Sequence, residues 1–257
     1  MIVAGACFLA GAATGVGSRG GKPTPAPVAY ERNVPILTYH AIADAPLGTA
    51  YPELFVSPRD FRAQIGWLRD GGYNAVTLDQ LHRAWHGSSS MPDKPVVISF
   101  DDGLQSQYTE ALPVLREIGW AGVLNLKLNS LRQGELDDAM VQRMIDAGWE
   151  TDSHTITHAD VAKLDGVELE REVSGSRRML RERFGVPVDF FCYPAGSYDH
   201  AAVAAVRRAG YRGATTTKPG LASPRDPYRM RRVRVNASDG LDGFVEEMGA
   251  VSEKSAT

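Results

Sequence analysis

The sequence predicts an α/β fold in which a parallel sheet closes into a distorted (β/α)7-type barrel. Short apolar runs rich in β-branched residues alternate with segments of helical periodicity about seven times along the chain. Such alternation is typical of a parallel sheet whose strands are connected by helices. The chain has 257 residues, 43% of them hydrophobic, which is enough for one core of this size, and we expect no second full domain.

The expected strands are short apolar runs, and each is followed by a polar turn or loop. They lie at 34–40, 74–78, 96–100, 122–128, from 149, 188–193, 211–217 and 230–235. The run from 96 to 100 is rich in β-branched residues and too short for a helix, which predicts a fully buried strand.

The expected helices are delimited by capping residues and glycines. In the first one, Ser57 is the N-cap, Pro58 occupies the first turn, and apolar side chains repeat at Phe61, Ile65 and Leu68. The later helices are expected at 79–85, 105–118, 137–147, 167–184, 200–209 and from 241. Glycines directly follow three of these helices, at positions 119, 148 and 185. Residues 44–58 contain prolines, glycine and aromatics without a period, which predicts a long loop of the kind that is often functional.

The amino-terminal region differs in composition from the rest of the chain. Residues 1–17 are apolar and rich in Ala and Gly, like a signal peptide or membrane anchor, but they are too short to span a bilayer. We expect residues 18–33 to form a Pro/Gly-rich linker and residues 34–257 to form the folded domain. We therefore expect a secreted or cell-envelope protein that touches a membrane only through its first segment.

Charge and cysteine content exclude several other classes of protein. The net charge is −3 and the sequence has no long basic run, so we expect no nucleic-acid partner. Its two cysteines form no disulfide framework, and Cys192, in an aromatic run, is expected to be a small buried residue.

Chemically active side chains lie at the ends of three expected strands: His40, the pair Asp101 and Asp102, and the pair His154 and His158. In a parallel barrel the carboxyl ends of all strands lie at the same end of the barrel, so these groups can meet there. Two histidines four residues apart and one carboxylate can bind a metal and leave positions open for water and substrate. Taken singly, Asp-Asp-Gly is also compatible with a turn or a helix cap, and the histidines with a solvated pair in a loop.

Together these motifs resemble the polysaccharide deacetylases, the nodulation-protein-type carbohydrate esterases. Residues 99–103, Ser-Phe-Asp-Asp-Gly, are close to the family's Thr-Phe-Asp-Asp-Gly, and residues 153–158 fit its Ser-His-Thr-x-x-His. Residues 191–196, Phe-Cys-Tyr-Pro-Ala-Gly, are similar to the Tyr-Pro-x-Gly of the branch that deacetylates β-1,6-linked poly-N-acetylglucosamine. The opening strand, with its Tyr39-His40, looks like the first strand of that branch.

The resemblance implies a role for each residue of these motifs. It implies that Asp102, His154 and His158 are the metal ligands and that Asp101 is the general base. It also implies that the backbone N–H of Tyr193 contributes to an oxyanion hole.

The general acid and the partner of the base depart from the common pattern of the family. The chain has no histidine after His200, so His40 takes the place of the carboxy-terminal acid if the barrel is circularly permuted relative to other polysaccharide deacetylases. The arginine that orients the base in many relatives is missing before Pro194, and Arg232 on the last strand is a candidate replacement.

The expected activity is metal-dependent removal of N-acetyl groups from a β-linked N-acetylglucosamine polysaccharide, with the β-1,6-linked polymer favoured and acetate released. The alternatives are a deacetylase of peptidoglycan or chitin-like oligomers, an O-acetyl xylan esterase, and an inactive carbohydrate-binding barrel. The ligand set suits Zn²⁺ best, while Co²⁺, Ni²⁺ and Fe²⁺ accept the same ligands. We expect an acetylated polysaccharide as the partner and a monomeric protein.

Overall fold

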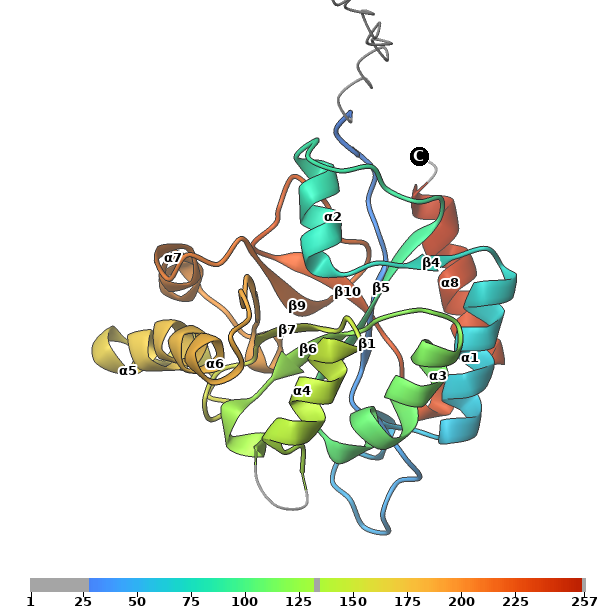
Figure 1. The fold of residues 1–257 in the computed structure, drawn as a ribbon, viewed down its shortest axis with the longest axis horizontal. Helices are drawn as coiled ribbons and strands as arrows, with labels where there is room; N and C mark the ends of the chain where they lie inside the picture. Colours follow the sequence, from blue (N-terminus) through green and yellow to red (C-terminus); the bar gives the residue numbers. More distant parts are fainter. Residues whose placement is uncertain (1–27, 132–134, 256–257) are drawn as a thin grey trace, which may run out of the picture.

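Seven parallel strands close on themselves to form the barrel. In the computed structural model, which describes residues 28–131 and 135–255, these strands are hydrogen-bonded in the order β1, β10, β9, β8, β7, β6 and β5, and β5 pairs again with β1 (Figure 1). A short strand, β4, pairs in parallel with the first residues of β5. The predicted α/β barrel is confirmed, while its circular permutation stays a prediction.

The strands of the barrel are short, and β5 and β9 are the longest. They are β1 (Ile36–Tyr39), β5 (Pro95–Asp101), β6 (Val123–Leu126), β7 (Glu150–Ser153), β8 (Phe190–Cys192), β9 (Gly213–Pro219) and β10 (Met230–Arg234), with β4 at Asn74–Ala75. All seven residues of β5 are buried, as the sequence predicts for this strand.

Helices surround the barrel (Figure 1). They are α1 (Pro58–Asp70), α2 (Leu78–Trp85), α3 (Leu112–Glu117), α4 (Asp138–Asp146), α5 (Gly166–Glu170), α6 (Ser176–Phe184), α7 (His200–Arg208) and α8 (Asp242–Ser255). The outward-facing side chains of the strands pack against these helices and the segments that join them to the strands. The centroid of the Phe100 ring lies 5.9 Å from that of Phe61 on α1 and 5.0 Å from that of Trp149, which lies just before β7. The main core therefore lies between the barrel and its helices.

The amino ends of the strands are sealed by apolar side chains. A second buried cluster joins α2 to residues near the starts of the strands: Ile36, Val97, Val123, Phe190 and Met230. Because this end is filled, any cavity inside the barrel must open at the carboxyl ends of the strands, where the predicted active residues lie.

Three local features were not predicted. The expected helices 105–118 and 167–184 contain π-helical segments, Gln107–Ala111 and Arg171–Gly175. In addition, β2 (Ala41–Ile42) and β3 (Phe55–Val56) pair in parallel at the two ends of the long loop. Strands of two residues are too short to show a period in the sequence, which explains why they were missed.

The structure describes only the end of the expected linker 18–33. In this part, Tyr30 N–H donates to Ala84 O over 2.9 Å and the Trp85 Nε1–H donates to Arg32 O over 3.2 Å, so the chain lies along α2 before it enters the domain. The predicted signal-like segment 1–17 lies outside the described residues. In the parts of the chain that are described, no helix combines the length and apolar character needed to cross a membrane.

Candidate active site

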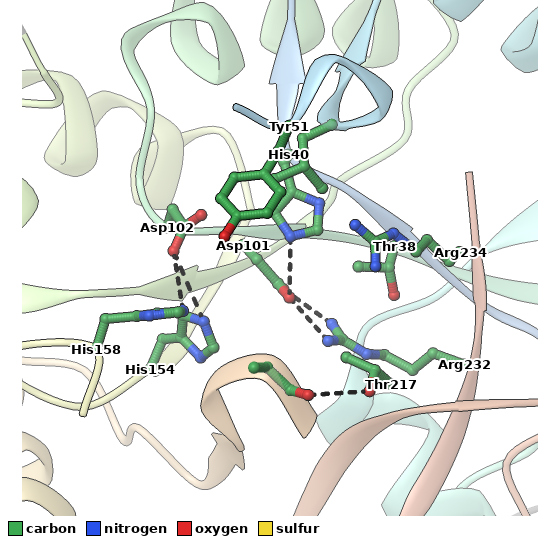
Figure 2. Close-up of a pocket in the computed structure, with 12 residues that line it drawn as sticks. Thr38, His40, Tyr51, Asp101, Asp102, His154, His158, Thr217, Arg232 and Arg234 are labelled. Carbon is green, nitrogen blue, oxygen red and sulfur yellow. Dashed lines mark hydrogen bonds and ion pairs between the residues drawn. The ribbon is translucent and has the colours of Figure 1, made fainter. Parts of the chain in front are cut away.

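The active-site candidates from the three strand ends, which carry His40, the two aspartates and the two histidines, gather around one cavity of about 490 Å³ at the carboxyl ends of the strands. Its lining includes all the predicted metal ligands, the predicted acid and base, and two arginines of β10: His40, Asp101, Asp102, His154, His158, Arg232 and Arg234. Figure 2 shows Asp102 and the two histidines on one side, the arginines on the other, and Asp101 and His40 between them.

The two adjacent acids point in different directions because the backbone changes conformation between them. Asp101 is the last residue of β5, whereas Asp102 has left the strand and has a φ of 77°. This left-handed conformation is uncommon for a residue other than glycine and costs free energy. Gly103 follows with a φ of 73°, and a Cβ there would collide with Leu126. The Ser130 hydroxyl donates to the Asp102 carbonyl and helps to hold the turn.

Asp102, His154 and His158 form a cluster of three ligand atoms. The Asp102 Oδ1 lies 3.7 Å from His154 Nε2 and 3.6 Å from His158 Nε2, and all three atoms lie within 4.8 Å of one another. These separations are too long for hydrogen bonds. The Nδ1 of His154 lies 2.8 Å from the carbonyl oxygen of Cys192, to which it can donate, and this leaves Nε2 free to bind a ligand.

A divalent metal fits this donor set. Two imidazole nitrogens and a carboxylate oxygen are typical zinc ligands, and atoms bound at about 2.0–2.2 Å in a tetrahedron lie about 3.3–3.6 Å apart. The observed separations of 3.6 and 3.7 Å are close to that range. A metal bound by these three residues would keep one position open for water or substrate.

A buried glutamate holds the turn that carries the two histidines. The Glu172 carboxylate accepts the backbone N–H groups of Ile156 (2.9 Å) and Thr157 (3.0 Å) and the Thr157 hydroxyl (3.1 Å). Glu172 belongs to one of the two unpredicted π-helical segments. In the other, the Gln107 side-chain amide donates to the carbonyl oxygens of His40 (3.0 Å) and Asp101 (2.6 Å). Both segments therefore support the site, although nothing in the sequence marked these two residues.

Asp101 is buried and held by several donors. Arg232 donates from Nη1 to Oδ1 and from Nη2 to Oδ2, each over 2.8 Å, and Asn125 donates to Oδ1 over 2.7 Å. Burial alone would raise the pKa of Asp101, but the charge and hydrogen bonds of Arg232 outweigh it and hold the pKa well below its usual range. Asp101 is therefore an anion at any working pH. Arg232, the candidate replacement of the arginine that is missing before Pro194, is therefore the ion-pair partner of Asp101.

His40 is mostly buried and lies beside this ion pair. Its Nε2 is 3.9 Å from Asp101 Oδ2, and its Nδ1 has no hydrogen-bond partner in the described part of the chain. Burial lowers the pKa of His40, and the Asp101 and Asp102 carboxylates only partly offset that effect. The imidazole is therefore neutral in the metal-free protein at neutral pH.

The structure contradicts the predicted role of Tyr193. Its backbone N–H donates to the carbonyl oxygen of Thr215 over 3.1 Å, so it is used in the pairing of β8 with β9, and its hydroxyl donates to Tyr228 O over 3.2 Å. Tyr193 is fully buried and does not line the cavity. Two residues further on, Ala195 does line it, with a φ of 52°, and its N–H has no partner among the described residues.

Three further residues lie in the cavity or close to the motifs. Tyr51 lines the cavity, whereas the Tyr198 ring lies tilted against the Tyr193 ring, with 5.1 Å between centroids. Asp152 precedes the histidine motif but faces away from the metal ligands, since its Oδ1 accepts the Phe190 N–H over 2.9 Å.

Comparisons with known proteins agree with this site. The Bacillus subtilis polysaccharide deacetylase YxkH is 30% identical over 223 residues, a match that covers 84% of this chain and 77% of YxkH. The chain belongs to the polysaccharide deacetylase family. The profile of that family matches residues 88–214, which include the Asp-Asp-Gly and histidine motifs. As a polysaccharide deacetylase, the protein is a hydrolase that releases acetate from an acetylated polysaccharide.

Solved structures show the same fold for this deacetylase. A polysaccharide deacetylase from Bacillus cereus is 31% identical, with a TM-score of 0.76 and coverage of 86% of this chain and 70% of that one. A Streptococcus pyogenes deacetylase in complex with acetate has a TM-score of 0.78 at 24% identity and covers 85% and 99% of the two chains. The Escherichia coli poly-β-1,6-N-acetyl-D-glucosamine N-deacetylase is 26% identical, and the match spans 85% of this chain but only 39% of that enzyme.

Replacing Arg232 by Gln tests the role of the buried ion pair. We expect a loss of about 3–5 kcal/mol in the free energy of unfolding at neutral pH, because a buried carboxylate loses its partner. In the wild type the folded-state pKa of Asp101 is depressed, so the stabilisation is present above the unfolded pKa of about 4 and is lost as the pH falls through the folded pKa. In the variant, burial without the guanidinium raises the folded-state pKa of Asp101 above its unfolded value. The loss of unfolding free energy relative to the wild type is therefore largest above this raised pKa, and it becomes smaller as the pH falls towards about 4. Denaturant unfolding at several pH values measures this dependence.

Arg231→Gln is the matched control for this prediction. It removes the same charge from the same strand, but Arg231 is exposed and lies outside the cavity. Its unfolding free energy should stay within about 0.5 kcal/mol of the wild type. If the loss of unfolding free energy in Arg232→Gln does not change with pH, Asp101 is not the ionised partner that Arg232 stabilises.

Proposed function

We propose that this deacetylase removes N-acetyl groups from a β-linked N-acetylglucosamine polysaccharide, with the β-1,6-linked polymer as the favoured substrate. The observation that carries the proposal is the cavity in which a metal-ligand set, a buried ionised carboxylate and a histidine meet. Support for the linkage comes from relatives named poly-β-1,6-N-acetyl-D-glucosamine N-deacetylases in Escherichia coli and Staphylococcus epidermidis, at 26% and 25% identity. The Tyr-Pro-x-Gly motif and His40 favour the same branch, and with it a circularly permuted barrel.

In this proposal Asp102, His154 and His158 hold the divalent metal, and Zn²⁺ is the first choice. When bound, such an ion lowers the pKa of water towards about 7 and polarises the acetyl carbonyl. Asp101 lies on the side of the cavity next to these ligands and takes the proton of the attacking water. The N–H of Ala195, in place of that of Tyr193, donates to the oxyanion that develops on the carbonyl.

His40 completes the reaction by giving a proton to the leaving nitrogen. An amine leaves poorly until it is protonated, so the reaction needs a general acid. Because Arg232 depresses the pKa of Asp101, the carboxylate is a weak base that keeps a proton only briefly. The neutral imidazole of His40, 3.9 Å from Asp101 Oδ2, is placed to receive that proton and pass it on.

We also propose that the enzyme acts outside the cytoplasm as a monomer. The apolar, Ala/Gly-rich segment 1–17 supports export or anchoring, and the Pro/Gly-rich segment that follows it supports a linker to the envelope. An extracytoplasmic place suits a polymeric substrate.

Replacing His40 by Gln should lower kcat for acetate release by about 10²- to 10⁴-fold, the usual contribution of a positioned acid. The KM and the metal content should change little, because His40 is not among the proposed ligands. Steady-state kinetics and metal analysis measure these quantities. His200→Gln, at an exposed position on α7, is the matched control and should retain wild-type kinetics. An equal effect on kcat/KM from both variants would exclude His40 as the acid.

Removal and restoration of the metal tests the proposed activity itself. Protein stripped with a chelator should release no acetate from N-acetylglucosamine oligomers, and reloading with Zn²⁺ or Co²⁺ should restore release. β-1,6-linked and β-1,4-linked oligomers of equal length are compared, and the β-1,6-linked oligomer should be preferred. Preference for the β-1,4-linked oligomer would indicate a peptidoglycan or chitin-like substrate. Acetate release only from acetylated xylan would show that the enzyme is an O-acetyl xylan esterase and not an N-deacetylase.

A further inference from the structure

Arg234 places a second guanidinium in the catalytic cavity. It is the last residue of β10 and lies two positions beyond Arg232, so both side chains leave the strand on the same side. Both line the cavity. In Figure 2 they lie across the cavity from Asp102, His154 and His158. Arg234 therefore faces the part of a bound substrate that lies away from the metal ligands.

The Arg234 guanidinium acts on other groups of the protein only at a distance, through weak effects of its charge on the pKa of Glu53 and of His40. Across the described parts of the chain its guanidinium forms no ion pair and no hydrogen bond, and the Asp101 carboxylate is already paired with Arg232. The nearby Glu53 carboxylate is engaged elsewhere, since it accepts the backbone N–H and the hydroxyl of Ser238 over 3.0 and 2.7 Å. An unpaired guanidinium at the wall of a cavity is free to act on a ligand.

With a metal held by its ligands, the cavity is unfavourable for a second, cationic ligand. Its two carboxylates, Asp101 and Asp102, are balanced by Arg232 and Arg234 before any metal binds. A divalent ion held by Asp102 and the histidines then leaves the cavity positive. A cleft lined by an excess of one sign attracts ligands of the opposite charge and repels those of the same charge.

We propose that Arg234 makes the enzyme sense the acetylation state of the sugar next to the one that it deacetylates. An N-acetylglucosamine is neutral and can accept a hydrogen bond from the guanidinium through its acetyl oxygen, whereas a glucosamine carries an ammonium group that Arg234 repels. The cavity, at about 490 Å³, is large enough for more than the reacting acetamido group. This inference rests on the proposed N-deacetylase function.

Selection against a charged neighbour would determine the pattern of the product. Each deacetylation converts a neutral sugar into a cation, so it makes the adjacent sugars poorer substrates. The product is then a partly deacetylated polymer whose glucosamines are spaced apart. The enzyme would produce this pattern without any second protein.

Defined β-1,6-linked trimers test the proposal. One trimer is fully acetylated, and in the others a single sugar beside an N-acetylglucosamine is glucosamine. For metal-loaded wild-type enzyme, kcat/KM per acetylated sugar should be about tenfold lower beside a glucosamine, the size expected for two like charges a few ångströms apart in a partly solvated site. Arg234→Gln should bring the ratio clearly closer to one, because only the charge of the metal site remains to repel the ammonium group, and Arg234→Lys should keep it.

Arg231→Gln is the matched control, because it removes the same charge from the same strand outside the cavity. It should keep the wild-type ratio. Raising the salt concentration from about 0.1 M to 1 M, which shortens the Debye length from about 10 to 3 Å, should reduce the discrimination of the wild type. On long polymers at equal extent of reaction, Arg234→Gln should give more adjacent glucosamine pairs than Arg231→Gln.

The possible results distinguish a failure of the role proposed for Arg234 from a failure of the proposed N-deacetylase function. Equal kcat/KM of the wild type on all trimers, or discrimination in Arg234→Gln as strong as in the wild type, overturns the role of Arg234 and leaves the proposed function intact. Absence of acetate release from every trimer, including the fully acetylated one, overturns the proposed function and this inference with it.

Discussion

The buried ion pair between Asp101 and Arg232 is the interaction on which the site depends. It joins β5 to β10, strands that are separated by β1 in the barrel, and it lies directly beneath the cavity. A carboxylate that is 3% exposed is stable as an anion only because the guanidinium and Asn125 satisfy its oxygens. The same pair fixes Asp101 and keeps the charge of Arg232 from the ligand, so that Arg234 is the cavity-lining guanidinium without an ion-pair partner among the described residues.

Two adjacent acids can perform different tasks because the strand ends between them. Asp101 retains the geometry of β5 and points into the barrel, while the left-handed backbone of Asp102 turns its carboxylate towards the histidines. The backbone strain at this turn is offset by the hydrogen bond from Ser130 and by close packing around Gly103. The turn therefore separates the proposed base from the proposed metal ligands by one residue.

The barrel and most site residues were predictable because their signals are local. Alternation of apolar runs and helices predicts the fold, and the two short motifs place Asp102 and both histidines in the cavity. Supporting contacts such as those of Glu172 and Asn125 were not predictable, since they link segments that only the fold brings together. Tyr193 was misassigned because the pairing of β8 with β9, which occupies its N–H, extends one residue beyond the end of the strand.

The most direct test of this account compares metal binding and turnover in Asp101→Asn and Asp102→Asn. Calorimetric titration of the chelator-stripped proteins with Zn²⁺ gives the affinity, and acetate release from a β-1,6-linked oligomer gives the activity. The account predicts that Asp101→Asn binds Zn²⁺ about as tightly as the wild type and releases no acetate, whereas Asp102→Asn loses both. Loss of Zn²⁺ binding in folded Asp101→Asn, or full activity in either variant, would contradict the separation of base from metal ligand.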